Sequence, residues 1–144
     1  MQQANYEEHL DLLKDCDLII EAIAERMDWK TDLYHKIAPF IAEGAIVASN
    51  TSGLSITKLS EALPELIKPR FCGIHFFNPP RYMTLIELIN TPTTGAAVLD
   101  NLEAFVTSGL GKNVIRAIDT PNLLPTASVL PACWPSSSRQ KRLA

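Results

Sequence analysis

An Asn-Pro-Pro sequence at positions 78–80 divides the most apolar part of this 144-residue chain. Proline fixes its own φ angle and has no backbone N–H to donate, so this sequence predicts a sharp turn. The apolar run 71–77 precedes the turn and contains His75, and the apolar run 85–89 follows it and contains Glu87. The two runs are therefore predicted to fold back on one another.

A lone carboxylate such as Glu87 is costly within an apolar strand unless a partner satisfies it. If the chain folds back at the prolines, His75 is the obvious partner. A carboxylate that orients an imidazole and stabilises its protonated form is a common way to build a general base near neutral pH. A structural histidine and a glutamate at an exposed sheet edge are the alternative interpretations of these two residues.

Short apolar runs alternate with segments of helical period along the chain, which predicts an α/β fold with a mostly parallel sheet and helices on both faces. The predicted strands are 18–24, 45–48, 71–77, 85–89 and 113–118, and the predicted helices are 6–14, 28–41, 56–63 and 94–109. Asp28 is expected to cap the second helix. Trp29, Phe40 and Phe105 are expected in the core.

Polar residues follow three of the predicted strands. They are Glu25 with Arg26, the segment 49–52, and His75 with Asn78. In open parallel sheets, ligands bind at the carboxyl ends of the strands. The three groups therefore predict one site at that edge of the sheet.

Composition excludes several classes of function. The net charge of −3 gives no basic footprint for nucleic acid. No apolar run reaches the ~20 residues that span a bilayer, and the polar, acidic start is unlike a signal peptide. The cysteines Cys16, Cys72 and Cys133 lack metal-ligand spacing, so we expect reduced thiols, no metal site and a cytoplasmic location.

The motifs together resemble a known family. Ala-Ser-Asn-Thr-Ser at 48–52, His-Phe-Phe-Asn-Pro at 75–79 and Leu-Ile-Glu-Leu-Ile at 85–89 are similar to the 3-hydroxyacyl-CoA dehydrogenases. The similarity extends back through 20–25 and Lys30 and forward to 119–122. It implies a Rossmann-like domain that binds NAD and takes a hydride from the C3 hydroxyl carbon of a 3-hydroxyacyl-CoA, as in fatty acid β-oxidation.

The resemblance also implies roles for individual residues. His75 would be the base that takes the hydroxyl proton, and Glu87 would orient it. Ser52 would hydrogen-bond the substrate oxygen near the nicotinamide, and Asn50 and Asn78 would line the nicotinamide end of the cofactor. The alternative for Ser52 and Asn50 is that they only make turn hydrogen bonds.

The cofactor ribose contacts of the family fall on Glu25 and Lys30 together with the backbone of Ile23 and Ala24. A solvated helix residue is the alternative interpretation of Lys30.

Two departures from the family pattern stand out. The sequence contains no Gly-x-Gly-x-x-Gly turn for a pyrophosphate, so we expect a partial Rossmann-like domain over residues 1–122 that lacks the first βαβ unit. Residues 123–144 are rich in Pro and Ser and end basic, so we expect a disordered tail. The relatives would continue here into a helical domain that makes their dimer. A one-base frameshift is our hypothesis for the tail, because suitable codons would then encode the family-like Phe-Ile-Ala-Asn-Arg.

These departures leave three functional interpretations open. The first is a fragment of an NAD-dependent dehydrogenase with little or no activity of its own. The second is a non-catalytic remnant or pseudogene product. The third is a serine hydrolase built on Ser52, which is disfavoured because the chain has no Gly-x-Ser-x-Gly elbow.

Overall fold

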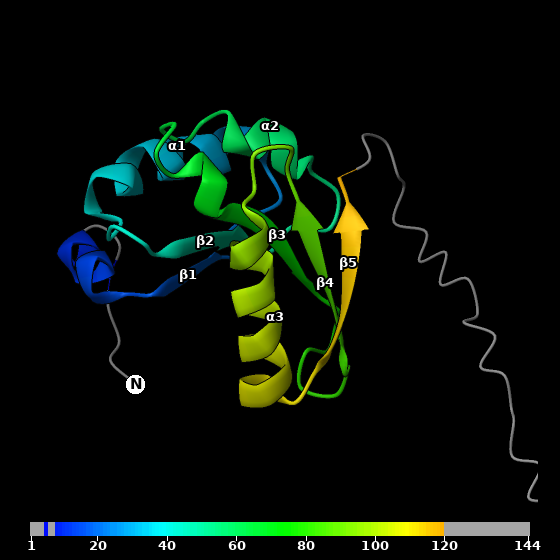
Figure 1. Cartoon of the computed structure of the whole chain (residues 1–144). Helices are drawn as coiled ribbons and strands as arrows, with labels where there is room; N and C mark the ends of the chain where they lie inside the picture. The colour runs from blue at the N-terminus through cyan, green and yellow to red at the C-terminus, as the bar shows by residue number, and fades with distance from the viewer. Residues whose placement is uncertain (1–4, 6–7, 120–144) are drawn as a thin grey trace, which may run out of the picture.

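The computed structural model describes residue 5 and residues 8–119 (Figure 1). The predicted domain end at 122 and the predicted tail 123–144 lie outside these residues. In chain order the elements are the 3-10 helix η1 (Leu10–Asp15), strand β1 (Leu18–Glu21), helix α1 (Met27–Ile37), 3-10 helix η2 (Ala38–Phe40), strand β2 (Ile46–Ser49), helix α2 (Ile56–Ser60), 3-10 helix η3 (Lys68–Arg70), strands β3 (Phe71–Phe76) and β4 (Leu85–Asn90), helix α3 (Ala96–Leu110) and strand β5 (Asn113–Ile118).

The five strands form one sheet in the order β1-β2-β3-β4-β5. The pairs β1–β2, β2–β3 and β4–β5 are parallel, and each is joined by a crossover that contains a helix. The pair β3–β4 is antiparallel and is the hairpin predicted at the Asn-Pro-Pro turn. The predicted α/β class with a mostly parallel sheet is confirmed.

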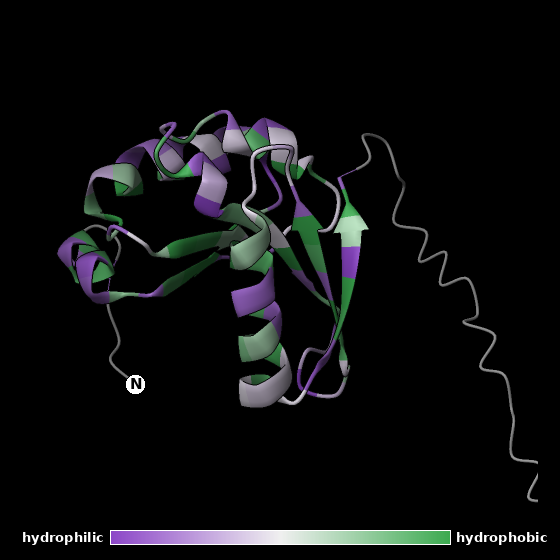
Figure 2. Ribbon diagram, viewed as in Figure 1, coloured by the Kyte–Doolittle hydropathy of each residue, from purple (hydrophilic) through white to green (hydrophobic). Residues whose placement is uncertain are grey.

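Helices cover both faces of the sheet, as predicted. Helices α1 and α2 lie on one side and α3 lies on the other (Figure 1). Successive strand residues point to opposite faces, so Val47 and Phe71 pack under α1 and α2, whereas Ala48 and Cys72 pack under α3. Figure 2 shows that the strands are largely apolar, whereas hydrophobic and hydrophilic residues alternate along the helices.

The start of α1 differs from the prediction. Asp28 is not the cap, because the helix begins at Met27 and Arg26 occupies the N-cap position. Asp28 instead accepts a hydrogen bond from Arg26 Nε at 3.1 Å. Trp29 is 51% exposed rather than buried, and the Arg26 guanidinium lies 4.7 Å from its ring centroid.

The buried face of α1 does not include Trp29. It consists of Lys30, Tyr34 and Ile37, which follow the spacing i, i+4, i+7. The pattern of apolar residues missed this face because Lys30 and Tyr34 carry polar ends. On α3, Phe105 is 47% exposed, so its predicted place in the core is also wrong, whereas Phe40 is half-buried.

The other boundaries are close to the prediction. The predicted helix at 6–14 is the 3-10 helix η1 where it is described, and the predicted strand 18–24 ends at Glu21. Helix α3 ends at Leu110 and is capped by Gly111, whose φ of 65° is the left-handed conformation that favours glycine. In the part of the chain that the structure describes, no helix is long and apolar enough to cross a membrane.

Candidate active site

The predicted site lies where β1, β2 and β3 end. These strands are mutually parallel, so their carboxyl ends share one edge of the sheet. The loop after β2 is tied to the end of β3, because the Phe76 N–H donates to Asn50 Oδ1 at 3.2 Å. Two of the three predicted polar groups are therefore joined directly.

His75 and Glu87 occupy directly opposite positions on β3 and β4. His75 Nδ1 lies 3.0 Å from Glu87 Oε2, and the two side chains are 21% and 33% exposed. Because a carboxylate can only accept, Nδ1 is the donor in this hydrogen bond, and in the neutral imidazole Nε2 would then be the acceptor. The Phe77 ring packs against the imidazole with centroids 4.7 Å apart, which further restricts its orientation. The pairing predicted from the two apolar runs is confirmed, and its chemical role remains a prediction.

Glu25 gathers the donors of the loop that carries Ser52. Its Oε1 accepts hydrogen bonds from the Thr51 hydroxyl, from Ser52 N–H at 3.0 Å and from Gly53 N–H at 2.9 Å. Partial burial alone would raise the pKa of the Glu25 carboxyl, but these hydrogen bonds, with a smaller contribution from the charge of Lys30, hold it below its ordinary value. Glu25 thus joins the polar group that follows β1 to the loop that follows β2. Its neighbour Arg26 instead pairs with Asp28.

Ser52 itself is exposed, and its backbone is held by Glu25. Among the described residues, no hydrogen bond joins the Ser52 hydroxyl to His75, so the Ser-His contact that a serine hydrolase needs is absent there. Asn50 Oδ1 accepts from Phe76, which leaves the two Nδ2 hydrogens as potential donors to a ligand.

Lys30 is fully buried, so its interpretation as a solvated helix residue is wrong. Its ammonium lies 2.6 Å from Glu21 Oε1 and donates to the Ile23 carbonyl at 3.3 Å. Ile23 and Ala24 are exposed in the turn that follows β1, and Asn78 is exposed in the hairpin turn, where its peptide bond to Pro79 is cis.

A buried polar cluster at the carboxyl end of β1 was not predicted from the sequence. We call Glu21, Lys30, Tyr34 and Ser49 the Glu21 cluster. Tyr34 and Ser49 donate to Glu21 Oε2 at 2.9 and 2.7 Å. Burial, together with the Glu21 charge, raises the pKa of the Tyr34 phenol, which therefore stays a donor. The available signal was a lone glutamate in an apolar run, the same signal that pointed to Glu87.

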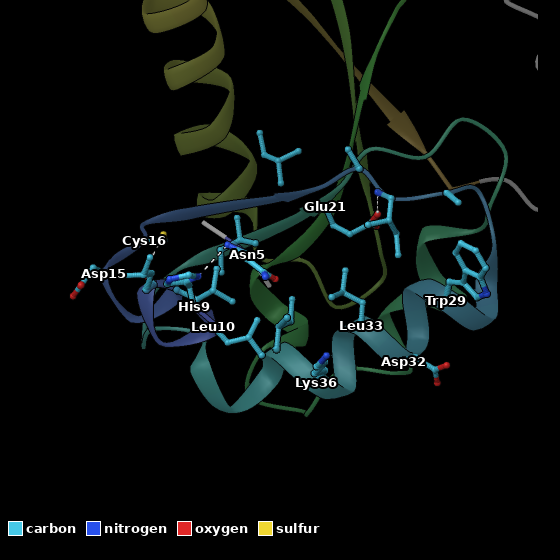
Figure 3. A pocket seen from close by; sticks show the side chains of 18 residues that line it. Asn5, His9, Leu10, Asp15, Cys16, Glu21, Trp29, Asp32, Leu33 and Lys36 are labelled. Carbon is cyan, nitrogen blue, oxygen red and sulfur yellow. Dashed lines mark hydrogen bonds between the residues drawn. The ribbon is translucent and has the colours of Figure 1, made fainter. Parts of the chain in front are cut away.

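The surface beside β1 is hollow. A space of about 900 Å³ is bounded by η1, β1 and α1, and most of its lining is apolar. In Figure 3, Glu21 and Trp29 lie toward one end of this hollow, and His9 and Cys16 lie toward the other. Within the described residues, no group of three His, Cys, Asp or Glu side chains could hold a metal ion.

Known proteins resemble this chain in sequence and in fold. Residues 1–120 match the family model described as the NAD binding domain of 3-hydroxyacyl-CoA dehydrogenase. A Rickettsia felis protein, provisionally named a fatty acid oxidation complex trifunctional enzyme, is 48% identical over 120 residues, which are 83% of this chain and 17% of that protein. The mitochondrial hydroxyacyl-coenzyme A dehydrogenase of Sus scrofa is 40% identical over 115 residues, which are 80% of this chain and 36% of that protein.

The solved structures give the same result. The crystal structure of (S)-3-hydroxybutyryl-CoA dehydrogenase PaaH1 from Ralstonia eutropha superimposes with a TM-score of 0.72 and 39% identity. The match covers 78% of this chain and 38% of that chain. The chain thus spans between about a sixth and two-fifths of the length of these relatives.

Proposed function

Because the chain belongs to the 3-hydroxyacyl-CoA dehydrogenase family, in its NAD-binding domain, we propose that its site serves NAD-dependent oxidation of the C3 hydroxyl of a 3-hydroxyacyl-CoA. The reaction class is the one named for its relatives, and the fatty acid oxidation context is named for the Rickettsia protein. The single observation that carries the proposal is the hydrogen bond between His75 and Glu87 at directly opposite strand positions.

The proposed base is His75. Its Nε2 accepts the proton of the substrate hydroxyl, and Glu87 on Nδ1 stabilises the imidazolium that results. The Ser52 hydroxyl donates a hydrogen bond to the substrate oxygen and so fixes the C3 carbon relative to His75. NAD, when bound, supplies the acceptor for the hydride that leaves C3.

The donors and acceptors at the carboxyl edge fit the nicotinamide half of this cofactor. Asn50 offers its amide hydrogens, and Asn78 is exposed at the hairpin turn. The exposed backbone at Ile23 and Ala24 can contact a ribose. Glu25 keeps Oε2 as an acceptor for a ribose hydroxyl, since its three loop donors all bind Oε1. Lys30 has no exposed surface, so we propose that it supports the ribose site indirectly, through Glu21 and the Ile23 carbonyl.

We also propose that this polypeptide alone turns over slowly or not at all. The sequence has no glycine-rich turn of the kind that binds the pyrophosphate of NAD, so we expect the cofactor to bind weakly. For the compartment we propose the cytoplasm, supported by the free thiols of Cys16 and Cys72.

A chimera tests the proposed chemistry separately from the expected weak activity of this chain alone. The matching segment of the Ralstonia enzyme is replaced by residues 1–119 of this chain, and NADH oxidation is followed with acetoacetyl-CoA. Turnover is expected, and His75→Gln is expected to lower it by about 10²–10⁴-fold, the usual contribution of a general base. The matched control is His35→Gln, which changes an exposed histidine on α1.

A folded chimera that keeps its activity with His75→Gln would overturn the proposal. Robust oxidation of a 3-hydroxyacyl-CoA by the 144-residue chain itself would overturn the expectation of weak activity. Labelling of Ser52 by a fluorophosphonate would instead support the hydrolase interpretation.

A further inference from the structure

Glu21 is the buried charge on which the carboxyl end of β1 depends. Each of its oxygens accepts two hydrogen bonds, Oε1 from Ile23 N–H at 2.7 Å and Lys30 Nζ, and Oε2 from the Tyr34 and Ser49 hydroxyls. Glu21 is 4% exposed, and its three side-chain partners have no exposed surface. The carboxylate therefore joins β1, α1 and β2 at one point, and both of its oxygens are hydrogen-bonded.

Two hydrogen bonds from the Glu21 cluster to Ile23 fix the turn that follows β1. The Ile23 N–H binds Glu21, and the Ile23 carbonyl binds Lys30, so this one peptide segment is held on both sides by the Glu21 cluster. Residues 22–26 are all exposed, and Ile23, at 36%, is the only one of them with a large apolar side chain, so polar contacts are the main restraint on the turn. Segments with few buried contacts open easily unless polar anchors restrain them.

The same turn carries the residue that holds the Ser52 loop. Glu25 lies two positions after Ile23, and its Oε1 accepts from Ser52 N–H and Gly53 N–H. Thr51, buried in the same loop, donates its hydroxyl to Glu25 and accepts from Leu54 N–H at 3.1 Å. A displacement of the turn would therefore move Glu25 and release the two loop amides.

We propose that Glu21 is a positioning residue: held by Lys30, Tyr34 and Ser49, it fixes the turn after β1 so that Glu25 can hold the loop that carries Ser52. The consequence for the reaction rests on the proposed function, because it assumes that Ser52 meets the substrate. The mechanical connection from Glu21 to the loop does not depend on any ligand.

The test uses the full 144-residue chain and two mild variants. Ser49→Ala and Tyr34→Phe each remove one hydrogen bond to Glu21 without leaving a buried charge unpaired, whereas Glu21→Gln would leave Lys30 unpaired and could prevent folding. The matched control is Ser60→Ala, which removes the hydroxyl of another buried serine, hydrogen-bonded at 2.6 Å to the Thr57 carbonyl.

The measurement is the amide NMR signals of Ser52 and Gly53 in an acid titration, with amide hydrogen exchange at neutral pH. In the unchanged chain both signals should move with one midpoint, and Glu25→Gln should abolish that movement. Ser49→Ala and Tyr34→Phe should raise the midpoint toward that of an ordinary glutamate and speed exchange of both amides by about tenfold or more. Ser60→Ala should do neither.

Unchanged midpoints and exchange rates in both variants would overturn the proposal, as would equal changes in Ser60→Ala, which would indicate a general loss of stability. The result is independent of the dehydrogenase chemistry. An inactive chimera together with the expected NMR response would reject the proposed function and keep the positioning role. An active chimera with unchanged NMR midpoints and exchange rates would keep the proposed function and reject the positioning role.

Discussion

The buried ion pair between Glu21 and Lys30 gives the sharpest prediction about stability. The two groups are 2.6 Å apart and their side chains are 1% and 0% exposed, so neither charge can be solvated if its partner is removed. Lys30→Met leaves the Glu21 carboxylate buried with three neutral donors, and Glu21→Gln leaves the Lys30 ammonium with the Ile23 carbonyl.

The expected cost follows from that burial. Removing one member of a buried pair typically costs about 3–5 kcal/mol of the free energy of unfolding. A small domain has only about 5–15 kcal/mol in total, so either change removes a large share of it. The double variant Glu21→Gln/Lys30→Met should cost less than the sum of the single changes by roughly 0.5–3 kcal/mol, because no unpaired charge remains.

Urea unfolding followed by circular dichroism measures this. With a slope near 2 kcal/mol per M, a loss of about 4 kcal/mol lowers the midpoint by roughly 2 M. The control is Asp28→Asn, which breaks the exposed pair with Arg26 and should leave the midpoint nearly unchanged. Single variants that lose less than about 1 kcal/mol, or a double variant whose loss equals the sum, would refute the reasoning.

Three further predictions concern other parts of the domain. A Cβ at Gly73 would lie 2.8 Å from Ile56 Cγ1, so Gly73→Ala should overpack the core and cost about 1–3 kcal/mol in thermal unfolding; an unchanged melting temperature would contradict this. Partial burial alone would raise the pKa of Asp119, but hydrogen bonds from the start of α2 hold it below its ordinary value of 3.8. Its stabilising contribution is therefore full above that ordinary value and is lost as the pH falls through the lower pKa of the folded state. Asp119→Asn should therefore weaken the acid dependence of urea unfolding between pH 5 and 2, and an unaltered dependence would count against the capping role. Burial raises the pKa of the Cys72 thiol to about 12, so in a variant whose third cysteine is changed to serine, maleimide at pH 7 should modify half-buried Cys16 well before Cys72; equal rates would show that the core opens.

The sequence predicted the parts of the fold that depend on local pattern. Apolar runs and an Asn-Pro-Pro turn were sufficient to place the hairpin, and the lone acid Glu87 pointed to its partner His75. The Glu21 cluster was missed although Glu21 carried the same signal, because its partners Lys30 and Tyr34 look like surface residues of a helix. A lysine side chain that is buried along its whole length cannot be recognised from periodicity alone.

Contacts between distant segments were also beyond the sequence. Glu25 was placed near the site, but its role as acceptor for the 51–53 loop depends on how a turn and a loop more than twenty residues apart are folded. The cap that Asp119 supplies to α2 joins residues more than sixty positions apart. Propensity fixes where such elements begin, whereas tertiary packing decides which side chain reaches them.

The hairpin that joins β3 to β4 limits how this protein can change in length. His75 and Glu87 meet because they stand opposite one another in an antiparallel ladder, where side chains alternate between the two faces. Deleting one residue inside either strand would send one partner to the opposite side, even if the new sequence were equally apolar. Residues can be gained or lost between positions 80 and 84, after the His-Phe-Phe-Asn-Pro motif, without that penalty. Variation in length among homologous chains should therefore concentrate there and avoid both of the flanking strands.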